Sequence, residues 1–125
     1  METIALLLKG FAVATQPQNL LACLVGVVAG TIIGALPGLG PSTGVAVLLP
    51  ITFGMNPVTA IVMLAGIYYG AMYGGSISSI LINTPGDSAA VMTCVDGHPL
   101  AQQGRAGPAL GMASFASFIG GTISV

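Results

Sequence analysis

Seven small polar residues in this sequence could bind ions without being charged themselves. Their side chains end in hydroxyl or amide groups, and they lie among prolines and glycines in two stretches of an otherwise apolar chain. Neutral oxygens of this kind suit Na⁺, and the free amides at the start of a helix suit an anion such as a carboxylate. The seven residues are Ser42, Thr43, Ser76, Ser78, Ser79, Asn83 and Thr84. They predict a binding site for an anion that is carried together with a cation.

The first polar stretch, residues 36–44, contains two prolines and three glycines. A helix does not pass through it unbroken, because each proline removes an amide donor and glycine is costly in a helix. Freed backbone groups at membrane depth are tolerated only inside protein or beside a water-filled cavity. The apolar segment that follows, residues 45–49, is too short to cross a membrane. Residues 37–54 are therefore predicted to form a helical hairpin or the second half of a broken helix.

The second stretch repeats this pattern. A break is predicted over residues 74–79, followed by a short apolar step, a second Pro-Gly tip at residues 83–88, and a short helix over 89–95. Residues 74–95 are thus expected to form a second hairpin. Two matching interruptions within one hydrophobic run point to the binding site of a membrane transporter.

Asp87 is the one charged residue in these stretches. It could N-cap the helix that follows Pro85 and Gly86, or it could take part in ion binding. We favour the capping interpretation.

The elements that hold these residues are predicted to be membrane spans. Residues 10–86 contain no Asp, Glu, Lys, Arg or His, and only 4% of the chain is charged against 54% hydrophobic. Soluble domains devote about a quarter of their residues to charge, so this chain is expected in a bilayer. The prediction is an all-α, polytopic membrane protein whose helices are broken at the Pro-Gly motifs. The predicted elements are an interfacial helix over 1–15, spans over 20–36 and 57–73, a loop over 96–107, and the start of a further span over 108–125.

Two glycine stripes indicate how the spans pack. Glycines recur every four residues in the first span, and a second set occupies the next span, so that helix backbones can approach closely. The first stripe is Gly26, Gly30 and Gly34, with Gly38 continuing the interval, and the second is Gly66, Gly70 and Gly74. Asn56 is expected to N-cap the second span, which opens at Pro57.

Several functions are excluded or disfavoured by composition. Nucleic-acid binding needs clustered basic residues, and the chain has only Lys9 and Arg105. Their positions favour a cytoplasmic location for both the N-terminus and the polar loop. Cys23 and Cys94 lack the spacing of a disulfide framework or a metal site, and His98 is interpreted as a loop residue. No catalytic set, metal site or cofactor is predicted, so an enzyme is disfavoured. A structural or channel-forming subunit remains the alternative to a transporter.

Three segments resemble a known family. They are LPGLGP at residues 36–41, IYYGAMYGGSISSILINTPG at 67–86, and DGHPLAQQGRAGPALG at 96–111. Together they are similar to the large membrane subunit of the tripartite tricarboxylate transporters, the TctA family. The similarity covers nearly the whole chain and corresponds to the N-terminal part of much longer family members, whose remainder is expected to hold further spans and a second copy of the Pro-Gly pattern.

The resemblance implies secondary uptake of tricarboxylates such as citrate, or of other organic acids, across the bacterial cytoplasmic membrane with Na⁺ or H⁺ as coupling ion. The implied partners are a small membrane subunit and a periplasmic solute-binding protein. It also implies that the two Pro-Gly segments line the transport site, which adds Pro37, Gly38, Gly40, Pro41, Pro85 and Gly86 to the candidate residues.

Overall fold

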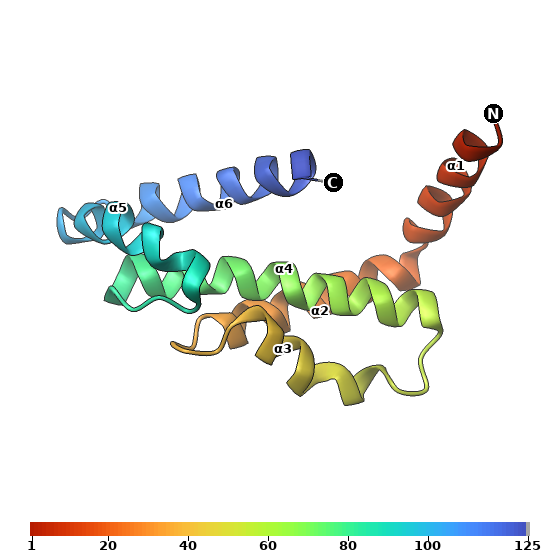
Figure 1. Ribbon diagram of the computed structural model, residues 1–125, viewed down its shortest axis with the longest axis horizontal. Helices are drawn as coiled ribbons and strands as arrows, with labels where there is room; N and C mark the ends of the chain where they lie inside the picture. Colours follow the sequence, from red (N-terminus) through yellow and green to blue (C-terminus); the bar gives the residue numbers. More distant parts are fainter. Residues whose placement is uncertain (125) are drawn as a thin grey trace.

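The computed structural model describes residues 1–124, which form six α-helices and two short 3₁₀ helices (Figure 1). The α-helices are α1 (Glu2–Ala14), α2 (Pro17–Gly34), α3 (Pro41–Leu48), α4 (Pro57–Ile82), α5 (Val91–Gln102) and α6 (Ala106–Ser124). The 3₁₀ helices are η1 (Leu49–Thr52) and η2 (Ser88–Ala90). The all-α prediction is confirmed within these residues; Val125, the end of the predicted last span, lies outside them.

Helices α2 and α4 form the centre of the structure and run parallel to each other. The parallel direction follows from their contacts: the Thr59 hydroxyl donates to Asn19 Oδ1 at 2.7 Å near the start of both helices. Further along, a Cβ atom on Gly26 would meet the Met63 carbonyl, and one on Gly34 would meet the Ala71 carbonyl. Both glycine stripes therefore lie at one seam, where the absence of side chains lets the two backbones touch.

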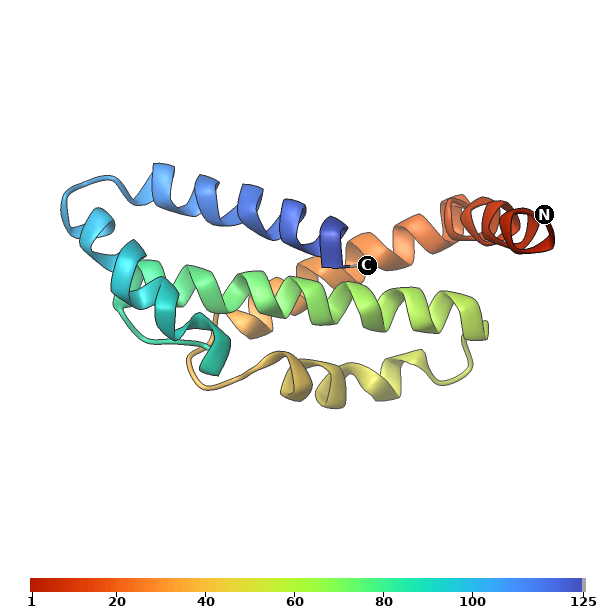
Figure 2. The same ribbon diagram turned by 45° about the horizontal axis from the view of Figure 1, so that its top comes forward.

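Because α2 and α4 are parallel, the chain between them has to return along their length. Helix α3 and η1 make this return on one side of the pair (Figures 1 and 2). A Cβ atom on Gly44 would lie 3.6–3.7 Å from side-chain carbons of Ile33, Ala71 and Ile67. Val45 and Leu48 of α3 pack on the core of Ala22, Met63 and Ile67. A short helix thus covers the seam between two long ones.

Helix α4 continues through the break predicted at residues 74–79, so this prediction is wrong, as is the predicted end of the span at residue 73. The helix runs from Pro57 to Ile82. The Asn56 side chain accepts from the Val58 amide at 3.0 Å, as predicted for the cap. Gly74 stays helical because it packs tightly: a Cβ atom there would lie 2.7 Å from the Ala35 nitrogen. Close packing offsets the roughly 1 kcal/mol helix penalty of a glycine.

The loop predicted over residues 96–107 is also largely helical. Helix α5 runs to Gln102 and contains Pro99. The chain turns only at residues 103–105, where Gly104 has φ +77° and the Arg105 amide donates to the Leu100 carbonyl at 2.9 Å. Composition suggested a loop, but packing of α5 on α4 holds this segment in a helix.

The surface of the structure is apolar along its long helices. Helices α2, α4 and α6 are long and apolar enough to cross a membrane. Large side chains such as Phe115, Phe118 and Ile123 on α6 are exposed. Helix α1 has no buried residue and diverges from the rest (Figure 1). The first span starts three residues before its predicted start and ends two residues before its predicted end.

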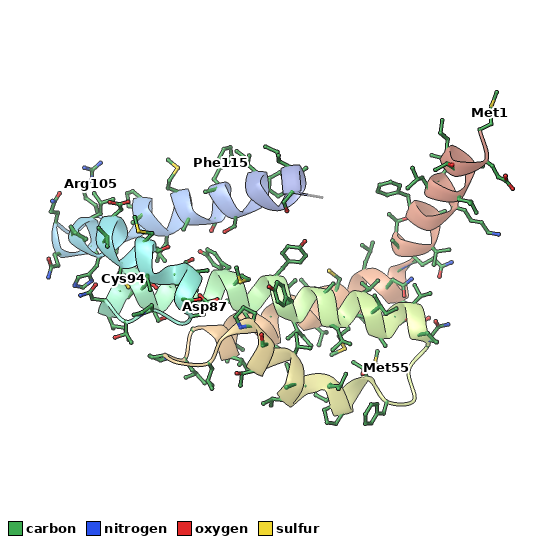
Figure 3. The ribbon with its side chains drawn as sticks, viewed as in Figure 1. Met1, Met55, Asp87, Cys94, Arg105 and Phe115 are labelled. Atoms are coloured by element: carbon green, nitrogen blue, oxygen red, sulfur yellow. The ribbon has the colours of Figure 1, made fainter. Side chains whose placement is uncertain are left out.

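Lys9 and Arg105 lie toward opposite ends of the central helices. Lys9 precedes the start of α2, which is joined to the start of α4 through Asn19 and Thr59. Arg105 follows α5, which packs against the other end of α4 (Figure 3). With α4 oriented across a bilayer, this arrangement favours opposite sides for the two residues instead of the predicted common cytoplasmic side.

Candidate functional site

The two Pro-Gly turns meet in the structure. The first turn lies between α2 and α3, and the second, residues 83–87, lies between α4 and η2. A Cβ atom on Gly40 would be 3.4 Å from the Cβ atom of Asp87. A Cβ atom on Gly86 would be 2.6 Å from Gly75 Cα and 3.1 Å from the Gly34 carbonyl oxygen. Glycine at position 86 thus allows the second turn to lie directly on α4 and on the end of α2.

The second turn folds back along α4 instead of extending past its end. Helix α4 has 26 residues, which corresponds to about 39 Å. Its neighbour at the turn, Gly75, precedes the last helical residue, Ile82, by about 10 Å of helix. Figure 3 shows Asp87 beside α4 in this way. The site therefore lies along the length of a candidate membrane span.

Asp87 is half-buried and has a defined role in the backbone. Its Oδ1 atom accepts from the Ala90 amide at 3.1 Å, which caps η2 and confirms the capping interpretation. Gly40 faces Asp87 where the two turns meet, a contact that we call the junction. Gly40 is the N-cap residue of α3 and offers no side chain to the first amides of that helix. A carboxylate thus stands close to the positive end of the α3 dipole.

A small cavity of about 110 Å³ opens beside Asp87. It is lined from α4, from the region of η2 and from α6, by Met72, Ser76, Asp87, Ala89, Ala90 and Ser117. Ser76 was predicted from the sequence as a site residue. Ser117 was not, because it lies in an apolar run without a nearby proline and no local signal distinguishes it from other span residues.

The predicted hydroxyl residues have three different environments. Ser42 and Thr43 are exposed in the first turn of α3, and Ser76 lines the cavity. Ser78 and Ser79 are buried within α4, where both hydroxyls donate to the Gly75 carbonyl, at 3.1 and 2.7 Å. These last two hydroxyls thus have their hydrogen-bonding partner within α4 itself.

Asn83 ends α4 in the left-handed conformation, with φ 56°. The Thr84 amide donates to the Ser78 carbonyl at 3.5 Å, which closes the last turn of the helix. Both side chains are exposed. Asparagine adopts this conformation more easily than most residues, so position 83 has a backbone role besides any role in binding.

The remaining predicted residues divide between the junction and the surface. Pro41 and Gly86 are buried, and Gly40 and Pro85 are half-buried. Pro37 and Gly38 are exposed, and Gly38 has φ +84° with open space around it. The structure therefore brings together Gly40, Ser76, Gly86 and Asp87, while the tip of the first turn points away from the seam.

The junction combines the groups that would suit a pair of oppositely charged ions. The start of α3 offers backbone amides to an anion, and the Asp87 carboxylate and the Ser76 hydroxyl offer oxygens to a cation. No group of three or more His, Cys, Asp or Glu side chains that could hold a metal ion occurs in residues 1–124.

Comparison with known proteins identifies the family. Residues 20–125 match the family described as the tripartite tricarboxylate transporter TctA family. The chain is 51% identical over 124 residues to an uncharacterised 52.8 kDa protein of Agrobacterium vitis, covering 99% of this chain and 25% of the relative. It is 32% identical over 110 residues to an uncharacterised protein of Methanocaldococcus jannaschii, covering 86% of this chain and 27% of the relative. No solved structure matches.

The chain thus spans about a quarter of the length of these curated relatives. The family is one of transporters and not of enzymes, and the three long apolar helices agree with a multi-pass membrane protein. This chain belongs to the tripartite tricarboxylate transporter TctA family.

Proposed function

We propose that this chain contributes the first part of the translocation site of a binding-protein-dependent secondary transporter. The transported solutes would be tricarboxylates such as citrate, or other organic acids, taken up together with Na⁺ or H⁺. Family membership supports the transporter class. The observation that carries the site is the junction of the two Pro-Gly turns, where Gly40 faces Asp87 beside α4.

The charges at this junction suggest how the cation and the anion are coupled. The amides at the start of α3 favour an anion, but the nearby Asp87 carboxylate repels one. A cation or proton on Asp87 would remove that repulsion and so raise the affinity for a carboxylate. By linkage, a bound carboxylate would raise the affinity for the cation by the same factor.

A tripartite transporter has further subunits besides this membrane subunit. We propose that they are a small membrane protein and a periplasmic solute-binding protein, which delivers the organic acid from outside the cytoplasmic membrane. With this arrangement the site would receive a solute that the binding protein has already captured.

Reconstitution of the full-length protein tests the proposal. The protein, its small membrane partner and the binding protein would be placed in liposomes under a Na⁺ or H⁺ gradient, and accumulation of radiolabelled citrate and other organic acids would be measured. We expect saturable accumulation that requires both the gradient and the binding protein. Passive flux that ignores the gradient would contradict coupled transport and support a channel-forming subunit instead.

A further inference from the structure

The end of α4 leaves the buried Ile80 carbonyl without its usual helical partner. In a continuing helix the Ile80 carbonyl would accept from the amide of residue 84. The Thr84 amide instead donates to the Ser78 carbonyl, because Asn83 has turned into the left-handed conformation. Ile80 itself is only 1% exposed, so its carbonyl needs a partner from within the protein.

His98 of α5 supplies this partner. Its Nδ1 atom lies 3.0 Å from the Ile80 carbonyl oxygen. A carbonyl oxygen can only accept a hydrogen bond, so Nδ1 must carry a proton. The bond joins residues 18 positions apart and connects α5 to the last turn of α4.

The residue before His98 explains why the imidazole can reach this carbonyl. Gly97 is buried against Ile80, and a Cβ atom on Gly97 would be only 2.7 Å from Ile80 Cγ1. The Gly97-His98 pair therefore acts as one contact, in which glycine permits close approach and histidine donates the hydrogen bond. The Gly97-His98 pair therefore has a role in packing α5 on α4, although its composition predicted a loop.

We propose that His98 is a positioning residue for transport. By holding the Ile80 carbonyl it fixes the last turn of α4, from which residues 83–87 fold back to bring Asp87 to Gly40. Without this bond, the end of α4 would gain an unpaired carbonyl and the turn would open more often. The effect on transport rests on the proposed function, whereas the effect on the turn does not.

The two amide side chains provide a matched test. The side-chain nitrogen of asparagine can occupy the place of Nδ1, whereas that of glutamine corresponds to Nε2 and cannot reach the same position. We would compare His98→Asn, His98→Gln and His98→Ala in the full-length protein. Hydrogen exchange of backbone amides in residues 81–90 would be followed by mass spectrometry, and uptake would be measured in liposomes. Gln102→Asn, on an exposed position of α5, controls for changes in helix propensity.

We expect exchange in residues 81–90 to rise about five-fold in His98→Gln and His98→Ala, as for the loss of one hydrogen bond, and to stay near wild type in His98→Asn. Uptake should fall in the first two variants and be retained in the third. Equal exchange in the Asn and Gln variants would overturn the proposal that the bond from His98 to the Ile80 carbonyl holds the end of α4. The expected exchange pattern with normal uptake in all three would overturn the positioning role. Failure of the wild-type protein to transport would contradict the proposed function alone, since the exchange test would still apply.

Discussion

Asp87 is the only charged side chain between Lys9 and Asp96, and it lies at the junction of the two turns. Its capping bond uses Oδ1 and leaves the second oxygen free for another ligand. At the scale of single residues, this combination makes Asp87 the best candidate for the group that couples binding of the cation to binding of the carboxylate.

Replacing Asp87 with asparagine should uncouple transport. Asparagine keeps an oxygen that can cap η2, but it loses the charge that a cation would neutralise. We expect the carboxylate to bind with little dependence on Na⁺ or H⁺, and gradient-driven accumulation to fall by about ten-fold or more. Substrate binding and uptake would be measured at several cation concentrations, with Asp96→Asn on the exposed side of α5 as control. Unchanged cation dependence in the Asp87 variant would contradict the coupling role.

Asn83 needs a pair of substitutions, because its side chain and its backbone conformation are separate properties. Asn83→Gly removes the amide group but tolerates the positive φ, whereas Asn83→Ala also adds strain of about 1 kcal/mol. We expect both variants to lose uptake if the amide group binds the solute or ion, and only the alanine variant to lower the thermal stability. Normal uptake by the glycine variant would exclude the Asn83 side chain from the site.

Some single-residue roles could be predicted from the sequence and others could not. Asn56 and Asp87 were recognisable as caps because a cap bonds to amides two or three residues ahead. Ser117 and His98 were not recognised, since their neighbours, the cavity and the Ile80 carbonyl, belong to other helices. Contacts that depend on how helices pack leave no local pattern.

At the scale of helices, the seam between α2 and α4 determines the positions of both turns. Gly30→Leu should disrupt it, because even a Cβ atom there would be 2.8 Å from Ile67 Cα. Forcing the backbones apart is expected to cost about 3 kcal/mol or more. The thermal stability of the purified protein would show this loss. Gly10→Leu on α1, where open space surrounds the glycine, should leave stability nearly unchanged; equal losses in both variants would contradict the importance of the seam.

The helices themselves were only partly predictable. The long apolar runs and the regular glycine spacing indicated α2 and α4 and their contact surfaces. The continuity of α4 through Gly74 and Gly75 was missed, because local propensity penalises glycine, while the packing that offsets this penalty comes from the end of α2 at Gly74 and from the second turn at Gly75. Helix α5 was missed for a similar reason: Gly97 and Pro99 suggest a loop until the contact with Ile80 is known.

At the scale of the whole molecule, the parallel direction of α2 and α4 predicts that the two ends of this helix pair lie on opposite sides of the membrane. Cysteines introduced at Lys9 and Arg105 should be labelled from opposite sides of the membrane by an impermeant thiol reagent, after Cys23 and Cys94 are replaced by alanine. Intact cells would expose one side of the membrane to the reagent, and inverted vesicles would expose the other side. Labelling of both cysteines from one side would contradict α4 as a span in this arrangement.

The contact between the two turns can be measured directly by disulfide formation. Cysteines at Gly40 and Asp87, in the full-length protein without Cys23 and Cys94, would have Cβ atoms about 3.4 Å apart, close to the 3.5–4.5 Å of disulfides. A matched pair of Val47→Cys and Asp87→Cys, with Val47 exposed further along α3, serves as control. We predict rapid cross-linking of the first pair in native membranes under mild oxidation and little of the second. A folded protein in which the Gly40 and Asp87 pair does not cross-link, or does so no better than the control, would contradict the proposed site.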